Sequence, residues 1–275
     1  MTQGISLSLV FAGASLLAAV AAPLAAAVLL CRRKKGVLGA IGGGALGFFA
    51  GAIVLETLCH QLVSMICPYL PQYPVLFGLY GALAAGVFEE TARLIVLRRL
   101  CRKDAGVYTG LGYGVGHGGL EALYIGLVGL SANPALLIAV ASGKSDTMLQ
   151  NLSDPAQRAA LQTVLDSVTS AAPVDFLAGG VERIVALLLQ IALSLLVWMT
   201  VAGRLPRWGY PLAIALHAGV DLFPMAYKVG AISSIWRIEL CIAVYAAVVC
   251  AGVWWAYRRT APAAGTPGAA QNGQP

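Results

Sequence analysis

Charged residues are scarce in this chain of 275 residues. Asp, Glu, Lys and Arg make up 11% of it and hydrophobic residues 59%, whereas a soluble domain carries about 25% charged residues. This composition excludes an ordinary soluble domain. Repeated glycine-containing apolar runs indicate membrane-spanning helices rather than a barrel. The net charge of +6 comes from Lys and Arg in short loops rather than along one recognition face, so no nucleic-acid partner is expected.

Several familiar sequence signals are also missing. The six cysteines form no Cys-x-x-Cys pair, which argues against a zinc ribbon or a disulfide framework. The His-Glu-x-x-His motif of common zinc proteases is absent from the sequence. Residues 1–9 hold no Lys or Arg, so we expect the first apolar run to be a retained span rather than a cleaved signal peptide. No internal repeat is visible, so the inverted-repeat signature of many transporters is missing.

Seven apolar runs are long enough to cross a bilayer, which takes about 20 residues each. They cover residues 5–30, 37–66, 75–97, 106–130, 176–201, 208–227 and 232–257. Dense basic clusters follow alternate runs, at residues 31–35, 98–103, 204–207 and 258–259. All of these clusters fall on one side of the membrane, and basic loops stay cytoplasmic. We therefore predict the N-terminus outside and the C-terminus inside.

The sequence thus predicts an all-α polytopic transmembrane helix bundle of the cell inner (plasma) membrane. Residues 1–259 form a single transmembrane domain in this interpretation. Residues 131–175 are polar and form an extracytoplasmic loop, with a surface helix expected over about 155–170, because Ser153-Asp154-Pro155 resembles a helix start. Residues 260–275 are mostly Ala, Gly, Pro and Gln, which predicts a disordered cytoplasmic tail.

Ionisable residues inside three of the runs are the strongest functional signal. They are Glu89, Glu90 and Arg93 in the third run, His117 and Glu121 in the fourth, and His217 and Asp221 in the sixth. A charged side chain at mid-bilayer costs at least ~2.5 kcal/mol. Such residues usually face a protein interior or a water-filled cavity and act there.

The depths of these residues predict that they meet. With a rise of 1.5 Å per residue from the cytoplasmic end, Glu89 lies about 13 Å deep, His117 about 16 Å and His217 about 15 Å. Unrelated polar residues would scatter in depth, so this coincidence predicts one shared site that opens toward the cytoplasmic half. Residues four apart share a helix face, so Glu121 accompanies His117 and Asp221 accompanies His217.

These residue types suit hydrolysis. A buried carboxylate such as Glu89 can act as general base on water, while His117 and His217 hold the water or stabilise the oxyanion. Asp221 orients or polarises, and Arg93 pairs with Glu89 or Glu90. Zinc is the alternative, because His117, His217 and Glu89 could be ligands, with Glu121 and Asp221 also at hand. The residues alone favour the metal-free route.

Three motifs resemble a known family. Phe-Glu-Glu-x-x-Arg at 88–93, Gly-His-Gly-Gly-x-Glu at 116–121 and His-x-x-x-Asp at 217–221 resemble the YhfC family of intramembrane peptidases. More distantly, they are similar to CAAX prenyl endopeptidases and bacteriocin-processing membrane proteases. On this resemblance Glu89 matches the catalytic carboxylate, Glu90 and Arg93 its companions, His117 the middle histidine, and His217 and Asp221 the last pair. The resemblance implies an intramembrane endopeptidase, glutamic-type or metal-dependent.

The implied partners are a membrane protein or lipidated peptide as substrate, and the lipid bilayer. Two other functions stay open: a proton-coupled membrane transporter, since buried Glu and His also mark proton relays, and a non-catalytic immunity or binding protein. Glu56 and His60 share a face near the outer end of the second run and are further candidates for lining the site. Glu182 and Arg183 are interpreted as a structural pair.

Overall fold

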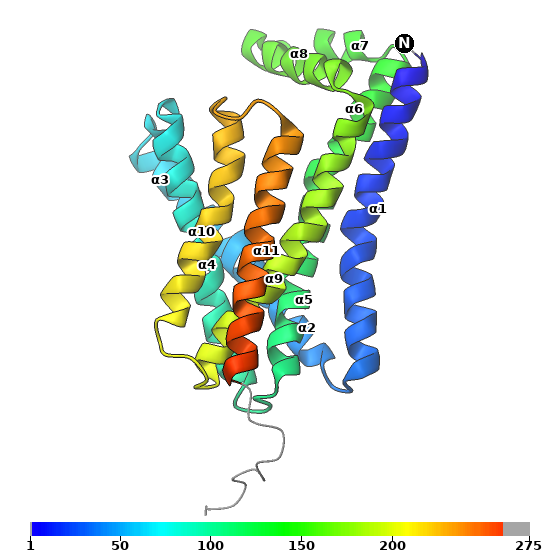
Figure 1. Ribbon diagram of the computed structural model, residues 1–275. Helices are drawn as coiled ribbons and strands as arrows, with labels where there is room; N and C mark the ends of the chain where they lie inside the picture. The colour runs from blue at the N-terminus through cyan, green and yellow to red at the C-terminus, as the bar shows by residue number, and fades with distance from the viewer. Residues whose placement is uncertain (1, 261–275) are drawn as a thin grey trace, which may run out of the picture.

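The all-α prediction is confirmed. A computed structural model describes residues 2–260, and the described part of the chain contains helices and no strand (Figure 1). The bundle elements are α1 (Thr2–Arg33), α2 (Leu38–Phe48), η1 (Phe49–Glu56), α3 (Thr57–Ile66), α4 (Pro74–Leu100), α5 (Val107–Ile125), η3 (Gly126–Leu130), α6 (Ala132–Ala141), α9 (Ala178–Val201), α10 (Gly209–Lys228) and α11 (Ile235–Thr260). The shorter elements are η2 (Leu70–Gln72), α7 (Ser145–Gln150), α8 (Pro155–Ser170) and η4 (Pro173–Leu177).

Six helical runs within residues 2–260 are long and apolar enough to span a membrane. The six are Gly4–Arg33, Leu38–Ile66, Pro74–Leu100, Val107–Ala141, Pro173–Val201 and Ile235–Thr260. The seventh predicted span corresponds to α10, which runs along the bundle beside α4 (Figure 1). This helix carries the polar residues His217, Asp221 and Lys228 and is not among the six runs. The predicted tail lies, apart from Thr260, outside the described residues.

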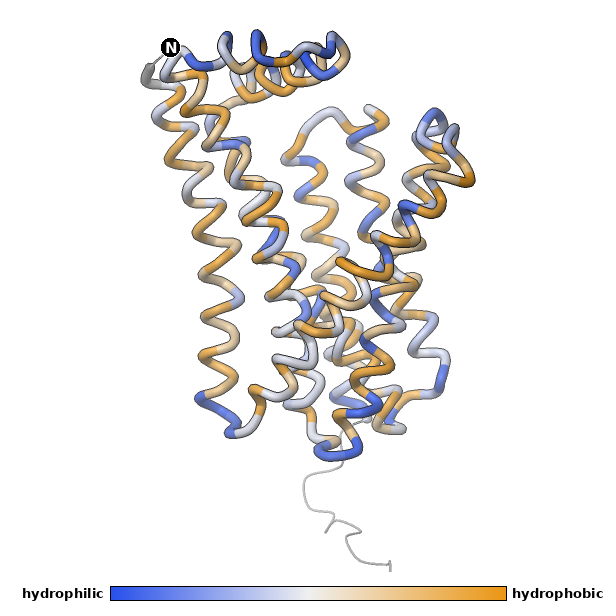
Figure 2. Tube along the Cα trace, turned by 180° about the vertical axis from the view of Figure 1, so that it is seen from behind, coloured by the Kyte–Doolittle hydropathy of each residue, from blue (hydrophilic) through white to orange (hydrophobic). Residues whose placement is uncertain are grey.

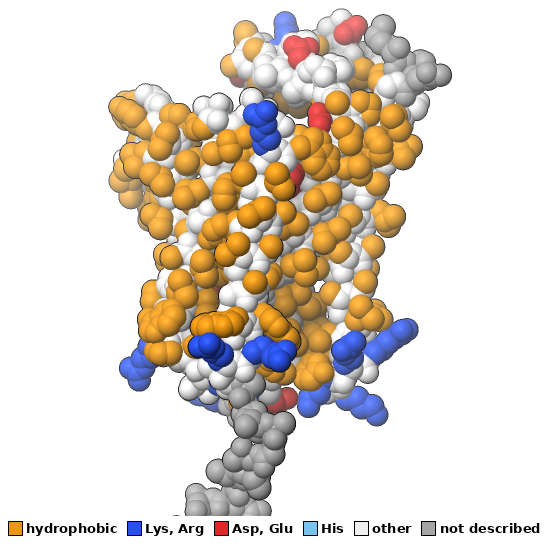
Figure 3. Space-filling model, viewed as in Figure 1, with side chains coloured by type: hydrophobic (Ala, Val, Ile, Leu, Met, Phe, Trp, Pro, Cys, Tyr) orange, Lys and Arg blue, Asp and Glu red, His pale blue; other side chains and the backbone are white. Residues whose placement is uncertain are grey.

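The two ends of the bundle differ in charge. Apolar residues cover its sides and polar residues gather at its ends (Figure 2). Lys and Arg side chains crowd one end (Figure 3), which we call the basic end; it carries the clusters at 31–35, 98–103, 204–207 and 258–259. At the opposite end, α8 lies across the bundle (Figure 1). Asp154 caps α8 by accepting from the Ala156 N–H at 2.9 Å, as its sequence predicts.

One predicted boundary is wrong. Residue 131 was expected to begin an extracytoplasmic loop, but η3 and α6 extend the helical run of α5 to Ala141. Residues 132–141 are apolar except for Asn133, and Pro134 lies in the first turn of α6, where a missing N–H is tolerated. The loop region therefore begins after Ala141.

Glycines on α5 allow neighbouring helices to approach on two faces. Gly114 and Gly118 face α9, where an added Cβ would lie 2.6 Å from Ile191 Cα and 2.8 Å from Gln190 Cβ, respectively. Gly116 faces α2, where an added Cβ would overlap the Ile41 carbonyl oxygen. Small residues let membrane helices pack at short range. This close packing places the polar residues of α5 deep inside the bundle.

Candidate functional site

Three helices bring one carboxylate and two imidazoles together. Glu89 of α4 lies 2.8 Å from His117 of α5, measured from Oε2 to Nε2, and 3.8 Å from the Nε2 atom of His217 of α10. All three side chains are buried. The structure thus joins the residues whose depths along their helices match.

Glu90 occupies the opposite side of His217. Its Oε1 atom lies 2.9 Å from Arg93 Nη1 and 2.7 Å from His217 Nδ1, and both Glu90 and Arg93 are fully buried. A carboxylate paired with a guanidinium is an acceptor, so we assign the Nδ1 proton of His217 as the donor to Glu90. The Nε2 lone pair of His217 then faces Glu89 and, at 3.9 Å, Asp221 Oδ2.

Glu121 is held at both oxygens. Arg183 Nη1 donates to its Oε1 atom at 3.1 Å, and Gln190 Nε2 donates to its Oε2 atom at 2.8 Å. Arg183 also pairs with Glu182 at 2.5 Å, so the pair expected from the sequence is present. The Arg183 guanidinium thus binds two carboxylates, those of Glu182 and Glu121.

Gln190 was missed by the sequence reasoning. It is buried on α9, and its Oε1 atom accepts a hydrogen bond from Arg93 Nη2. Gln190 therefore connects the Glu90–Arg93 pair with Glu121. A neutral amide in an apolar run carries no charge signal, but a glutamine in a membrane span is itself an unusual polar group that could have drawn notice.

The donor set suits a metal ion. Ligand atoms of Glu89, His117 and Glu121 all lie within 4.8 Å of one another. One imidazole and two carboxylates are ligand types that zinc accepts, and three protein ligands leave a position for water or substrate. The group differs from the expected set, because Glu121 replaces His217. His117 Nδ1 is buried without a hydrogen-bond partner among the described residues.

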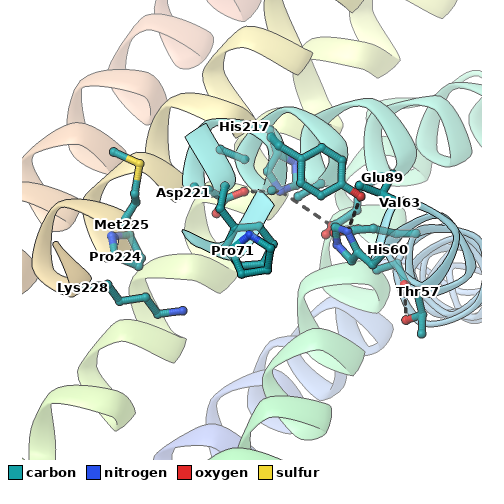
Figure 4. A pocket seen from close by; sticks show the side chains of 18 of the residues that line it. Thr57, His60, Val63, Pro71, Glu89, His217, Asp221, Pro224, Met225 and Lys228 are labelled. Carbon is teal, nitrogen blue, oxygen red and sulfur yellow. Dashed lines mark hydrogen bonds and ion pairs between the residues drawn. The ribbon is translucent and has the colours of Figure 1, made fainter. Parts of the chain in front are cut away.

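A cavity of about 720 Å³ leads to these residues. Glu89, Glu121, His217 and Asp221 line its inner part, and the η2 region and the end of α10 line its outer part. Figure 4 shows Glu89, His217 and Asp221 together with Pro71 of η2 and Lys228 of α10. The expectation that the site opens toward the basic end is wrong, because the lining residues of α3, η2 and α10 lie at the other end of the bundle. Depth along single helices gives no information on where the helices separate.

Glu56 and His60 line the same cavity. His60 Nε2 lies 3.1 Å from Glu56 Oε1, and His60 Nδ1 lies 2.7 Å from the Tyr80 hydroxyl group on α4. Tyr80 is nine residues before Glu89, about 13 Å along the helix. These three residues form part of the wall of the cavity that Glu89 also lines.

Comparisons with known proteins agree with the motifs. The chain matches the family described as YhfC intramembrane metalloprotease over residues 17–242. It is 34% identical over 215 residues to the "Uncharacterized membrane protein YhfC" of Bacillus subtilis (strain 168). The matched region covers 77% of this chain and 81% of that protein. No solved structure matches the chain. This chain is therefore a multi-pass membrane protein that belongs to the YhfC intramembrane metalloprotease family.

Proposed function

We propose that the protein is a metal-dependent intramembrane endopeptidase whose ion is held by Glu89, His117 and Glu121. The observation that supports this proposal is the mutual approach of their ligand atoms within 4.8 Å. Zinc fits the imidazole and carboxylate donors. When bound, such an ion supplies a Lewis acid that activates water and polarises the scissile carbonyl. The family description points the same way.

His217 is the group that we assign to proton transfer. Glu90 fixes its orientation through the 2.7 Å contact at Nδ1, and its Nε2 atom lies 3.8 Å from Glu89 Oε2 among the residues that line the cavity. A carboxylate that orients a histidine in this way is a recurrent arrangement for general acid–base catalysis. His217 would accept the proton of the attacking water and return it to the leaving amine. Asp221, which lies beside Nε2 at 3.9 Å, stabilises the protonated form.

The substrate that we propose is a membrane-embedded or membrane-associated polypeptide. The cavity volume of about 720 Å³ lies within the range that binds ligands, roughly 300–1,000 Å³. From Pro74 at its outer part to Glu89 at its inner part, α4 rises about 22 Å. A peptide segment would therefore have to enter from the end of the bundle away from the basic end and reach deep into the bundle. A lipidated peptide is the narrower alternative.

A metal-free glutamic route at the same site is the second candidate. It is favoured by the 2.8 Å contact between Glu89 and His117, which would let Glu89 act as general base beside an imidazole donor. The residue types in the sequence alone favour this route. The second carboxylate of the group, Glu121, is our reason for proposing the metal instead, since a metal-free base needs no second carboxylate within 4.8 Å.

The proposal is tested by metal content and chelation. We expect the protein purified in detergent to contain about one zinc per chain, and a zinc chelator to abolish peptide cleavage until zinc is restored. Cleavage that persists in a metal-free preparation would support the glutamic route instead. Absence of cleavage by the zinc-loaded protein, with proteomic substrates included, would contradict the peptidase function.

Substrates are sought by comparing membrane proteomes. Cells with the Glu89→Gln variant should lack a fragment that the wild type produces, while the variant accumulates normally. Glu239→Gln is the matched control, because Glu239 is a buried carboxylate of α11 that does not line the cavity. Identical proteomes in wild-type and Glu89→Gln cells would contradict the assignment of Glu89.

A further inference from the structure

Gln190 is a buried polar residue to which the proposed chemistry assigns no step. Its side chain lies between a cation and a carboxylate: Oε1 accepts from Arg93, and Nε2 donates to Glu121 Oε2 at 2.8 Å. A glutamine amide offers one acceptor end and one donor end. The opposite charges of Arg93 and Glu121 therefore permit only one orientation of this amide.

The packing of α9 on α5 holds Gln190 in place. An added Cβ at Gly118 would lie 2.8 Å from Gln190 Cβ and 3.1 Å from Leu187 Cδ1, so Gly118 leaves the space that the stem of Gln190 fills. Gly118 follows His117 directly and precedes Glu121 by three residues. The amide is therefore packed against the same stretch of helix that presents two of the proposed ligands.

The two residues that donate hydrogen bonds to Glu121 differ in the number of their carboxylate partners. Arg183 is shared between Glu121, at 3.1 Å, and Glu182, at 2.5 Å. Gln190 Nε2 has Glu121 as its carboxylate partner, and its orientation is fixed by Arg93. A carboxylate oxygen that accepts one hydrogen bond keeps another lone pair for a metal ion. Hydrogen bonds of this kind orient ligands and set metal affinity.

We infer that Gln190 is a positioning residue that acts through Glu121, holding its carboxylate toward Glu89 and His117 for metal binding. This inference rests on the proposed metal site. It assigns to the Gly114–Gly118 face of α5 a purpose beyond packing, since the close approach of α9 lets a neutral side chain reach Glu121.

The test measures zinc binding by the full-length protein in detergent, so it does not depend on a substrate. We expect Gln190→Leu to lower zinc affinity by about 10- to 100-fold, the usual effect of removing a group that orients a ligand. Gln190→Asn keeps the amide but shortens its reach, and should lower zinc affinity similarly. Ser194→Ala is the matched control, because Ser194 is buried one turn along α9 and donates only to the Gln190 carbonyl oxygen; it should keep wild-type affinity.

A double-mutant cycle identifies the route. If Gln190 acts through Glu121, Gln190→Leu should have no further effect in a Glu121→Gln background. An effect that adds to that of Glu121→Gln would overturn the inference and indicate that Gln190 acts through Arg93 instead. Wild-type affinity in both Gln190 variants would also overturn it. Absence of zinc binding by the wild type would instead contradict the proposed metal site, and this inference with it.

Discussion

Acidic, basic and neutral polar side chains of the site form one continuous series of contacts. This series runs through Glu182, Arg183, Glu121, Gln190, Arg93, Glu90 and His217. Each guanidinium lies between two acceptors. A buried charge without a partner is strongly unfavourable, so this arrangement lets ionisable groups remain inside an apolar bundle. It also couples them, because a change at one residue alters the partners of the next.

The first prediction concerns Arg93. Arg93→Met keeps most of the side-chain volume but leaves Glu90 without its cation. Removing one partner of a buried pair costs about 3–5 kcal/mol, so we expect low membrane accumulation and a clearly lower Tm in detergent. Arg98→Met is the matched control, since Arg98 is exposed near the end of the same helix and should change stability by less than about 0.5 kcal/mol. Equal Tm values for the two variants would refute this role of the Glu90–Arg93 pair.

At the scale of single elements, α5 determines the geometry of the site. Its glycines serve two neighbours, with Gly112 and Gly116 facing α2 and Gly110, Gly114 and Gly118 facing α9. Between them stands His117, fully buried. The spacing of four residues on each face is the pattern of tightly packed membrane helices. Because these glycines carry no side chains, α5 packs closely against both neighbours.

The second prediction follows from this packing. In Gly116→Ala, the new methyl group would overlap the Ile41 carbonyl oxygen of α2, and α2 would have to move away from His117. Overpacking of this kind typically costs about 1–3 kcal/mol. We expect a lower Tm together with weaker zinc binding. Gly42→Ala on α2 meets nothing within 4 Å and should behave as wild type; a wild-type Tm for Gly116→Ala would show that the helices can separate freely.

The helices and the meeting of Glu89, His117 and His217 could be predicted from the sequence, because charge scarcity, run length and depth along a helix are local quantities. Three features could not. Gln190 carries no charge. The helical run continues into the apolar α6 although polar residues stand at its start. The direction of the cavity depends on where the helices separate. Each of these is decided by contacts between distant parts of the chain.

At the scale of the whole molecule, the basic end and the cavity mouth are at opposite ends of the bundle. Exposed Lys and Arg gather at the basic end (Figure 3), while the cavity extends toward η2 and the end of α10. If basic clusters stay cytoplasmic, the mouth faces the extracytoplasmic side. Substrate segments would then enter from that side of the membrane.

The third prediction tests this orientation with single-cysteine variants. Cys67 is exposed near the mouth and Cys31 is exposed near the basic end. In intact cells, a membrane-impermeant maleimide should label Cys67, and it should label Cys31 only after permeabilisation. Labelling of Cys31 in intact cells, and of Cys67 only after permeabilisation, would show the opposite topology. Cys101 is a poor reporter, because burial raises the pKa of its thiol to about 11; its labelling should be slow at neutral pH and become faster as the pH rises toward that value.

The position of the mouth also has a consequence for turnover. Below Glu89, the way to the basic end is filled by the packed core of Leu94, Leu97, Tyr113, Leu193 and Trp198. If water, peptide and cleaved fragments all pass through this cavity, a retained fragment would keep out the water needed for the next cycle. We expect pre-steady-state kinetics to show a burst, with fragment departure slower than bond cleavage, and short fragments added in excess to act as competitive inhibitors.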